Sequence, residues 1–233
     1  AERDSDVKGV ILEVNSPGGE VTASDKIRHR IAQFKESGKK LYFQMGDVCA
    51  SGGVYISSPA DKIYAYPTTI TGSIGVIISS FNIEQLMNKV GVKSVIFKSG
   101  EMKDILSSSR TMSKKEKRLV QELVDAHYQR FVTLLSSDRN LPKEEVEKVA
   151  DGRIFTAEQA KKLKLIDEIA YVQDTLKDLK ADLKLKRATV VTYRKPFSWL
   201  PFGEGQYGSQ SNPLFELATY FATPKAMYIM PSF

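Results

Sequence analysis

The run CASGGVY, from Cys49 to Tyr55, contains the residues best suited to covalent chemistry. Ser51 lies between a small residue and two glycines, so a peptide backbone could approach its hydroxyl group closely. A serine that opens a helix also has backbone N–H groups facing an incoming oxygen atom. Those groups could form half of an oxyanion hole, which stabilises the negative charge that develops in acyl transfer. The same pattern is also typical of a glycine-rich turn with a capping serine.

A second glycine-rich turn, NSPGG at residues 15–19, could supply the other half of an oxyanion hole. Pro17 restricts the backbone of this turn. Gly18 and Gly19 carry no side chains, so their N–H groups can be directed into the same pocket.

A serine nucleophile needs a base, and the sequence does not indicate a histidine for that role. His29 lies in the basic run KIRHRI and His127 in a long predicted helix, and both settings are typical of surface or edge-packed histidines. The G-x-S-x-G pattern of nucleophile elbows is missing, as are phosphate-binding loops and metal-ligand spacings. We therefore expect neither a metal nor another cofactor.

A lysine can act as the base when its amine is neutral. A lysine pKa of ~10.4 would have to fall by ~3 units, which corresponds to ~4 kcal/mol and is within the reach of burial in an apolar site. Lys103, in the run GEMKDIL, has Met102, Ile105 and Leu106 nearby and is the best candidate on local context. Spacing alone does not select it, because the chain has many lysines.

The elements that would position these residues alternate between strand and helix from residue 7 to residue 98, which favours parallel strands joined by helices. Buried strands are predicted at residues 7–14, 40–45, 62–66, 74–81 and 93–98. Helices are predicted at residues 21–36, 51–59 and 83–90, and a turn at residues 67–73.

Helices dominate after a polar loop at residues 99–112. Ser113 followed by Glu116 has the capping-box pattern and predicts the start of a long helix, 114–137. Another helix is predicted after Pro142. A short strand then precedes a helix capped by Thr156, with Gln159 at its third position; a helix at 172–183 and a strand at 188–194 follow.

The end of the chain has a different composition. Residues 196–213 are rich in Gly, Pro, Ser and Gln and predict a linker. A short amphipathic helix is predicted at 214–221, and an apolar, extended tail at 225–233. We therefore divide the chain into a domain at 1–195 and a linker with a tail at 196–233.

The motifs NSPGG, ASGGVYIS, ADKIYA, TGSIGVI and KSGEMKDI, followed by SSSR and DGRIFTAEQAKKLKLIDEIA, occur in this order. From about Val7 to Ile169 the chain resembles the signal peptide peptidase A family of serine–lysine peptidases. The resemblance implies an α/β fold of the Clp protease and crotonase type, with repeated ββα units. It also implies a helical extension, here about residues 113–184, that is used in assembly. The alternative for the long helix that begins after Ser113 is packing on its own domain.

The resemblance also implies the roles of individual residues in a serine endopeptidase. Ser51 matches the nucleophile and Lys103 the general base. Ser73, in TGS, matches the serine that orients the lysine. Gly18 and Gly52 match the glycines that donate to the oxyanion. Cys49 is expected to be a small buried residue.

The partners implied by the resemblance are extended hydrophobic peptides, such as signal peptide remnants, and further copies of the chain in a homo-oligomeric ring. Members are associated with the bacterial cell membrane, with the catalytic domain on the extracytoplasmic side. The membrane segment and first strand that usually precede the matching portion are not in this sequence, so the anchor is expected outside it. The apolar tail is a candidate occupant of a peptidase groove, its own or a neighbour's; an edge strand elsewhere or disorder is the alternative.

Composition excludes several other classes of protein. The 233 residues are 42% hydrophobic and 27% charged, as in ordinary soluble domains, and no run reaches the ~18 apolar residues of a membrane span. The net charge of +6 comes from scattered lysine-rich helical faces without interleaved aromatic residues, which does not indicate nucleic-acid binding. The single cysteine excludes an internal disulfide.

Two alternatives share the expected fold. A crotonase-type acyl-CoA hydratase or isomerase would need a carboxylate base, for which Glu20 is the nearest candidate. A non-catalytic, membrane-associated scaffold would have no need for Ser51, Ser73 and Lys103, so their presence disfavours it.

Overall fold

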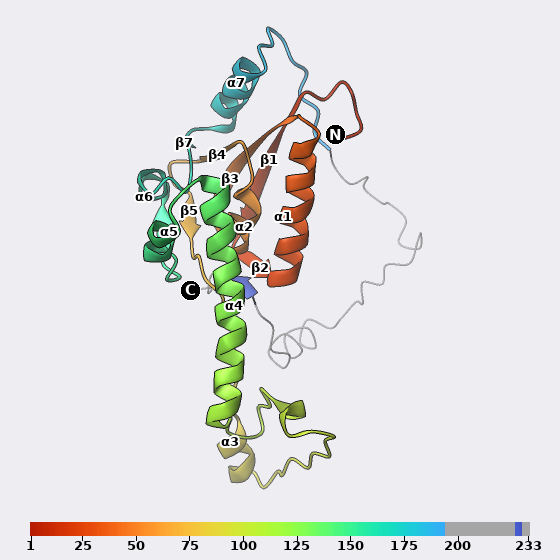
Figure 1. Ribbon diagram of the computed structural model, residues 1–233, viewed down its shortest axis with the longest axis vertical. Coiled ribbons are helices and arrows are strands. Elements are labelled where there is room, and N and C mark those ends of the chain that lie inside the picture. Colours follow the sequence, from red (N-terminus) through yellow and green to blue (C-terminus); the bar gives the residue numbers. More distant parts are fainter. Residues whose placement is uncertain (194–226, 230–233) are drawn as a thin grey trace. The chain divides into compact units, whose positions relative to one another are not determined.

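The computed structural model describes residues 1–193 and the strand 227–229 (Figure 1). These residues fall into two compact units. The first unit contains residues 1–78, 113–186 and 227–229, and the second contains residues 79–112 and 187–193.

The first unit is built around a mostly parallel sheet whose central strand, β3, spans Lys40–Ala50 (Figure 1). β1 pairs with one edge of β3, whereas β4 and β5 pair with the first and second halves of the other edge. All three are parallel to β3; β7 continues the sheet parallel to β4, and β6 is antiparallel to β5. These strands are β1 (Gly9–Ser16), β4 (Lys62–Ala65), β5 (Ile70–Gly72), β6 (Ile154–Thr156) and β7 (Glu168–Ile169).

Side chains on β3 alternate between two cores, as the pleat of a strand requires. Phe43 and Met45 belong to the larger core, with residues of α1 (Val21–Glu36), α2 (Gly52–Ser57) and α4 (Lys114–Arg139). Tyr42 packs on the opposite face with Leu179 of α7 (Val172–Asp182). Because both faces are covered, the strand is buried along most of its length. This parallel-rich α/β architecture confirms the predicted fold class.

The helix starts follow the local signals. Ser113 Oγ accepts a hydrogen bond from the Glu116 N–H at 3.2 Å, and the Glu116 carboxylate accepts one from the Ser113 N–H at 2.8 Å. Thr156 and Gln159 form the same reciprocal pair at the start of α6 (Ala157–Lys162). The capping boxes predicted for both helices are therefore confirmed, and α5 (Lys143–Val149) follows Pro142 as expected.

The strand predicted at residues 74–81 is wrong, and the expected turn before it contains β5 instead. The chain leaves the sheet after Gly72 and Ser73, whose φ angles of 87° and 50° do not continue a strand. The apolar run at residues 74–81 has strand-like composition, but it follows this turn and forms no strand among the described residues.

The second unit contains α3 (Glu84–Lys89) and a 3-10 turn at Glu101–Asp104. The strands predicted at residues 93–98 and 188–194 are wrong for the described residues, none of which pairs there. Val95 is 75% exposed and Phe97 is 95% exposed. Strand propensity reflects packing on a pleated surface, and no neighbouring strand supplies that surface in the described part of this unit.

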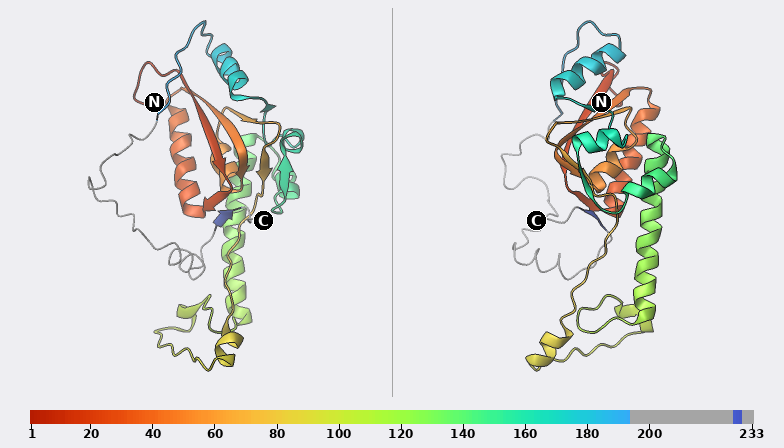
Figure 2. Two further views of the ribbon diagram at one scale, coloured as in Figure 1. Left: turned by 180° about the vertical axis from the view of Figure 1, so that it is seen from behind. Right: turned by 90° about the vertical axis from the view of Figure 1, so that its left-hand side faces the viewer.

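A short second sheet joins two distant segments of the first unit (Figure 2). β2 (Gly18–Glu20) follows β1, and it pairs antiparallel with β8 (Met227–Ile229), with Gly18 opposite Ile229. The extended conformation predicted for the tail is confirmed for residues 227–229. The predicted linker at 196–213 and helix at 214–221 lie outside the described residues.

Candidate active site

The parallel strands β1, β3 and β5 of the first unit have their carboxyl ends next to one another. Ala50 pairs with Gly72, so Ser51 and Ser73 are the residues that directly follow two neighbouring strands. Ser16, the last residue of β1, pairs with Cys49. The carboxyl ends of parallel strands are where open α/β sheets bind ligands. The structure thus brings together at one edge the two serines and the NSPGG turn.

Ser51 is fully buried and has an unusual backbone, with φ 51° and ψ −110°. Two backbone hydrogen bonds hold it: its N–H donates to the Gly72 carbonyl at 2.7 Å, and its carbonyl accepts from the Tyr55 N–H at 2.9 Å. A positive φ at a residue other than glycine is strained by ~1–3 kcal/mol and occurs preferentially at functional sites. The sharp turn from β3 into α2 is therefore built around this serine.

The hydroxyl oxygen of Ser51 has no hydrogen-bond partner among the described residues. Buried polar atoms are nearly always hydrogen-bonded, and leaving one unsatisfied costs ~1–3 kcal/mol. A hydroxyl group held in this state is typical of one that serves catalysis rather than folding.

The two glycine-rich turns are in direct contact. A Cβ atom placed on Gly52 would lie 3.0 Å from the Gly19 nitrogen, 3.2 Å from the Gly18 Cα and 2.8 Å from Ser24 Oγ. Gly52 is the first residue of α2, and its N–H group has no acceptor within the helix. The Gly18 N–H donates to Ser16 Oγ at 3.2 Å, so an incoming oxygen would compete with that hydroxyl group.

Ser73 is buried as well, and like Ser51 it has a positive φ. Its N–H donates to the Arg153 carbonyl at 2.7 Å. Lys103 lies in the second unit, in the 3-10 turn, where it is exposed rather than buried in the apolar setting expected for a neutral lysine. Its N–H donates to the Gly100 carbonyl at 3.1 Å. The structure therefore gathers Ser51, Ser73, Gly18 and Gly52 within one unit, and the pairing of Ser51 with Lys103 stays a prediction.

Cys49 is fully buried, and this burial raises the pKa of its thiol to about 12. Its sulfur atom would lie 2.9 Å from a Cβ on Gly53, so it packs against the first turn of α2. The prediction that Cys49 is a small buried residue is confirmed.

Two carboxylates that the sequence analysis missed hold α2 in place. The Tyr55 hydroxyl donates to Asp25 of α1 at 2.5 Å, and Arg130 of α4 binds the same carboxylate at 2.7 Å. Burial alone would raise the pKa of Asp25, but these two donors outweigh it and leave the pKa below its ordinary value.

Asp138 of α4 is the second carboxylate. It accepts a hydrogen bond from the Ser58 hydroxyl at 2.5 Å and forms a bidentate ion pair with Arg28 of α1. The partners of both carboxylates are 30 to 110 positions apart in the chain, so no local pattern could have identified them.

The structure also places the residues that other mechanisms would need. His29 is exposed on α1, and His127 lies on α4. Glu20, the carboxylate considered for a hydratase, is exposed at the end of β2. Among the described helices, none combines the length and apolar character needed to cross a bilayer.

Comparisons with known proteins identify the family of the chain. The model of peptidase family S49 matches residues 33–186. A putative signal peptide peptidase SppA of Enterococcus faecium is 40% identical over 97% of this chain and 70% of its own length. Protease 4 of Salmonella typhi is 36% identical over 80% of this chain, which spans 30% of that protein.

Among solved structures, a mutant of ClpP1 from Listeria monocytogenes aligns with a TM-score of 0.47 and 19% identity, covering 72% of this chain and 77% of that one. The match to the S49 model covers more than half of the chain, and the Enterococcus relative extends over nearly all of it. The chain belongs to peptidase family S49 and is a serine protease.

Proposed function

We propose that this protease cleaves peptides with a serine–lysine dyad, with Ser51 as the nucleophile and Lys103 as the general base. The observation that carries the proposal is the buried, unpartnered hydroxyl of Ser51 at a strained turn. Such a group needs a base brought to it, and the sequence resemblance points to Lys103.

In this mechanism neutral Lys103 accepts the hydroxyl proton as Ser51 attacks the peptide carbonyl carbon. The N–H groups of Gly18 and Gly52 donate to the oxyanion, and their contact across the two turns supports this shared role. Ser73 orients the lysine amine. The protonated lysine then donates its proton to the leaving amine, and water hydrolyses the acyl-enzyme.

The proposed substrates are extended hydrophobic peptides, such as the remnants of signal peptides, at a membrane surface on the extracytoplasmic side. The Enterococcus relative bears the name of a signal peptide peptidase. The pairing of β8 with β2 supports binding in extended form, because it demonstrates that the strand containing Gly18 accepts an added antiparallel strand. The tail that contributes β8 would occupy this edge as a pseudo-substrate.

Assembly into a homo-oligomeric ring belongs to the same proposal. Leu119 and Leu123, on the first half of α4, are 41% and 48% exposed, which supports the helical extension as an assembly surface. Light scattering on the purified protein tests this, and a purely monomeric species at micromolar concentration would contradict it.

The dyad is tested with Ser51→Ala and Lys103→Ala, assayed on a quenched fluorescent hydrophobic peptide and with a fluorophosphonate probe. Both variants should lose more than ~10³-fold in kcat/KM with an unchanged circular dichroism spectrum. The nucleophile and the base act together, so removing either one should abolish most of the rate enhancement. Ser79→Ala and Lys93→Ala, which change exposed residues, are the matched controls. Retained activity in Lys103→Ala would exclude it as the base.

A further inference from the structure

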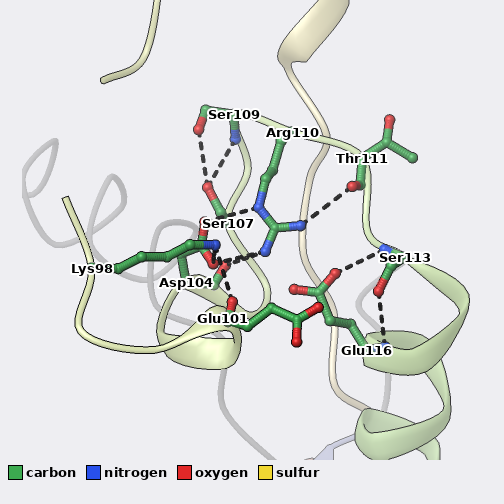
Figure 3. A network of polar contacts seen from close by, with 9 residues as sticks. All are labelled: Lys98, Glu101, Asp104, Ser107, Ser109, Arg110, Thr111, Ser113 and Glu116. Carbon is green, nitrogen blue, oxygen red and sulfur yellow. Dashed lines mark hydrogen bonds and ion pairs between the residues drawn. The ribbon is translucent and has the colours of Figure 1, made fainter. Parts of the chain in front are cut away.

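Two basic side chains, Lys98 before the 3-10 turn that carries Lys103 and Arg110 after it, bind residues of the turn (Figure 3). Lys98, before the turn, donates to the carbonyl oxygen of Glu101 at 3.0 Å and to Oδ1 of Asp104 at 2.7 Å. A single ammonium group thus connects the first and last residues of the turn. The backbone hydrogen bonds within the turn are short-range, such as that from the Ile105 N–H to the Met102 carbonyl at 3.1 Å, and isolated 3-10 turns are weak.

Arg110, after the turn, binds Asp104 more extensively. Its Nε donates to Oδ2 at 2.9 Å and its Nη2 to Oδ1 at 2.8 Å, and Nη2 also contacts the Asp104 carbonyl oxygen at 3.3 Å. A bidentate pair of this kind defines orientation as well as distance. The Asp104 side chain is only 11% exposed, and the two cations hold its pKa well below the usual range, so the carboxylate stays charged.

The residues after Lys103 are attached to the segment that leads into α3. The Ser80 hydroxyl donates to the Leu106 carbonyl at 3.1 Å, and the Ile83 N–H donates to the Ser108 carbonyl at 2.8 Å. Leu106 has φ 66°, an unfavourable conformation for a leucine that surrounding contacts must maintain. The backbone on both sides of Lys103 is therefore restrained.

We propose that Arg110 and Lys98, acting through the Asp104 carboxylate, are positioning residues that hold Lys103 where its amine can accept the Ser51 proton. The inference rests on the proposed dyad and adds to it the residues that hold the turn from which the Lys103 side chain extends. No contact with substrate is required of these residues. A displacement of about 1 Å at a reacting group can cost about 10²-fold in rate, so loss of the ion pairs should be visible in turnover.

The test uses peptide hydrolysis by Arg110→Ala, Arg110→Lys and Lys98→Met in the full chain. Arg110→Ala should lower kcat by about 10- to 100-fold and leave KM within about twofold, because the substrate site is unchanged. Arg110→Lys, which keeps the charge but not the bidentate geometry, and Lys98→Met should lose less. Arg118→Ala, at an exposed arginine of α4, should behave as wild type.

The same substitution made in the Lys103→Ala variant distinguishes a positioning role of Arg110 from a general loss of protein stability. If Arg110 acts only through Lys103, Lys103→Ala with Arg110→Ala should hydrolyse an activated p-nitrophenyl ester at the same residual rate as Lys103→Ala alone. A further loss of similar size in the double variant would overturn the inference, as would wild-type kcat in both Arg110 variants. An active Lys103→Ala protein would instead refute the dyad itself.

Hydrogen exchange provides a readout that does not depend on activity. The amides of Lys103 and Ile105 should exchange faster in Arg110→Lys, whereas those at the centre of α4 should keep their protection. If Arg110→Ala fails to fold, Arg110→Lys and Lys98→Met decide the matter. Unchanged exchange and unchanged kcat in those two variants would contradict the proposal.

Discussion

The chemistry of the site depends first on single glycines whose surroundings leave no space for a side chain. Gly52 lies so close to Ser24 and to the Gly18–Gly19 turn that a Cβ atom at this position would clash with them unless one of the segments moved. Gly53 is similarly confined by Cys49 and Ser16. Small residues therefore bring two backbone segments close enough to act on one oxygen atom.

Gly52→Ala should lower kcat by at least ~10-fold, because the added methyl group separates the two sources of oxyanion N–H groups. Overpacking of this kind should also lower the free energy of unfolding by ~1–3 kcal/mol. Steady-state kinetics and urea unfolding measure the two effects. Gly75→Ala, where the nearest atoms are 3.7 Å and 3.8 Å from the new Cβ, is the control. A wild-type kcat in Gly52→Ala would remove the steric argument.

The thiol of Cys49 should be inert in the folded protein. Burial keeps its pKa at about 12, so the reactive thiolate is scarce at neutral pH, and reagents cannot reach the sulfur atom. We expect maleimide labelling at pH 7.5 to be slow in buffer and fast in 8 M urea, followed by mass spectrometry. Rapid labelling of the native protein would show that the turn into α2 opens readily.

At the level of secondary structure, α2 is a six-residue helix that cannot be stable by itself. Asp25 and Asp138, from two longer helices, accept hydrogen bonds from its Tyr55 and from Ser58 at its end. Tyr55 also packs edge-on against Phe131 of α4, with ring centroids 5.0 Å apart. These contacts determine the direction of α2 and hence where Ser51 lies.

The Asp25 contact predicts a specific pH dependence of stability. The folded-state pKa of Asp25 is depressed below its ordinary 3.8, so its contribution is complete well above pH 4 and disappears as the pH falls through the folded pKa. Asp25→Asn should therefore lower Tm by a constant amount above about pH 5, and the difference should shrink below about pH 4.

Thermal unfolding between pH 2.5 and pH 8 measures this difference. Asp47→Asn, at an exposed aspartate, is the control. A gap between wild type and Asp25→Asn that widened in acid would contradict the assignment.

For the whole molecule, the tail strand is the feature from which a prediction about substrate binding follows. β8 pairs with β2 next to the proposed oxyanion donor Gly18. If substrates bind as a strand at the same edge, the tail competes with them.

Deletion of residues 224–233 should therefore lower KM for a hydrophobic peptide several-fold while kcat changes little. Kinetics of the truncated and complete chains, at protein concentrations below and above any assembly transition, provide the measurement. Unchanged KM would argue that substrate binds away from β2.

Local patterns predicted much of the fold. The helix at 21–36 and the capping boxes at Ser113 and Thr156 agree with the structure, because caps and helical periodicity act over only a few residues. The strand predictions at 74–81 and 93–98 failed, because apolar β-branched composition does not reveal whether a neighbouring strand exists. The second half of β3 and all of β5 pair with one another, and β1 and β6 pair on their outer sides, so these strands depend on contacts between distant segments.

The sequence by itself determined the glycine-rich turns, the nucleophile candidate and membership of the family, since these depend on residue types in a short order along the chain. Only the tertiary structure decided that Ser51 has a strained backbone and a hydroxyl without a partner, and that Gly52 presses against Gly18. It alone also decided that Asp25 and Asp138 secure α2. The physical reason is that strain, burial and hydrogen-bond satisfaction are properties of contacts between segments far apart in the chain, and a linear pattern does not contain them.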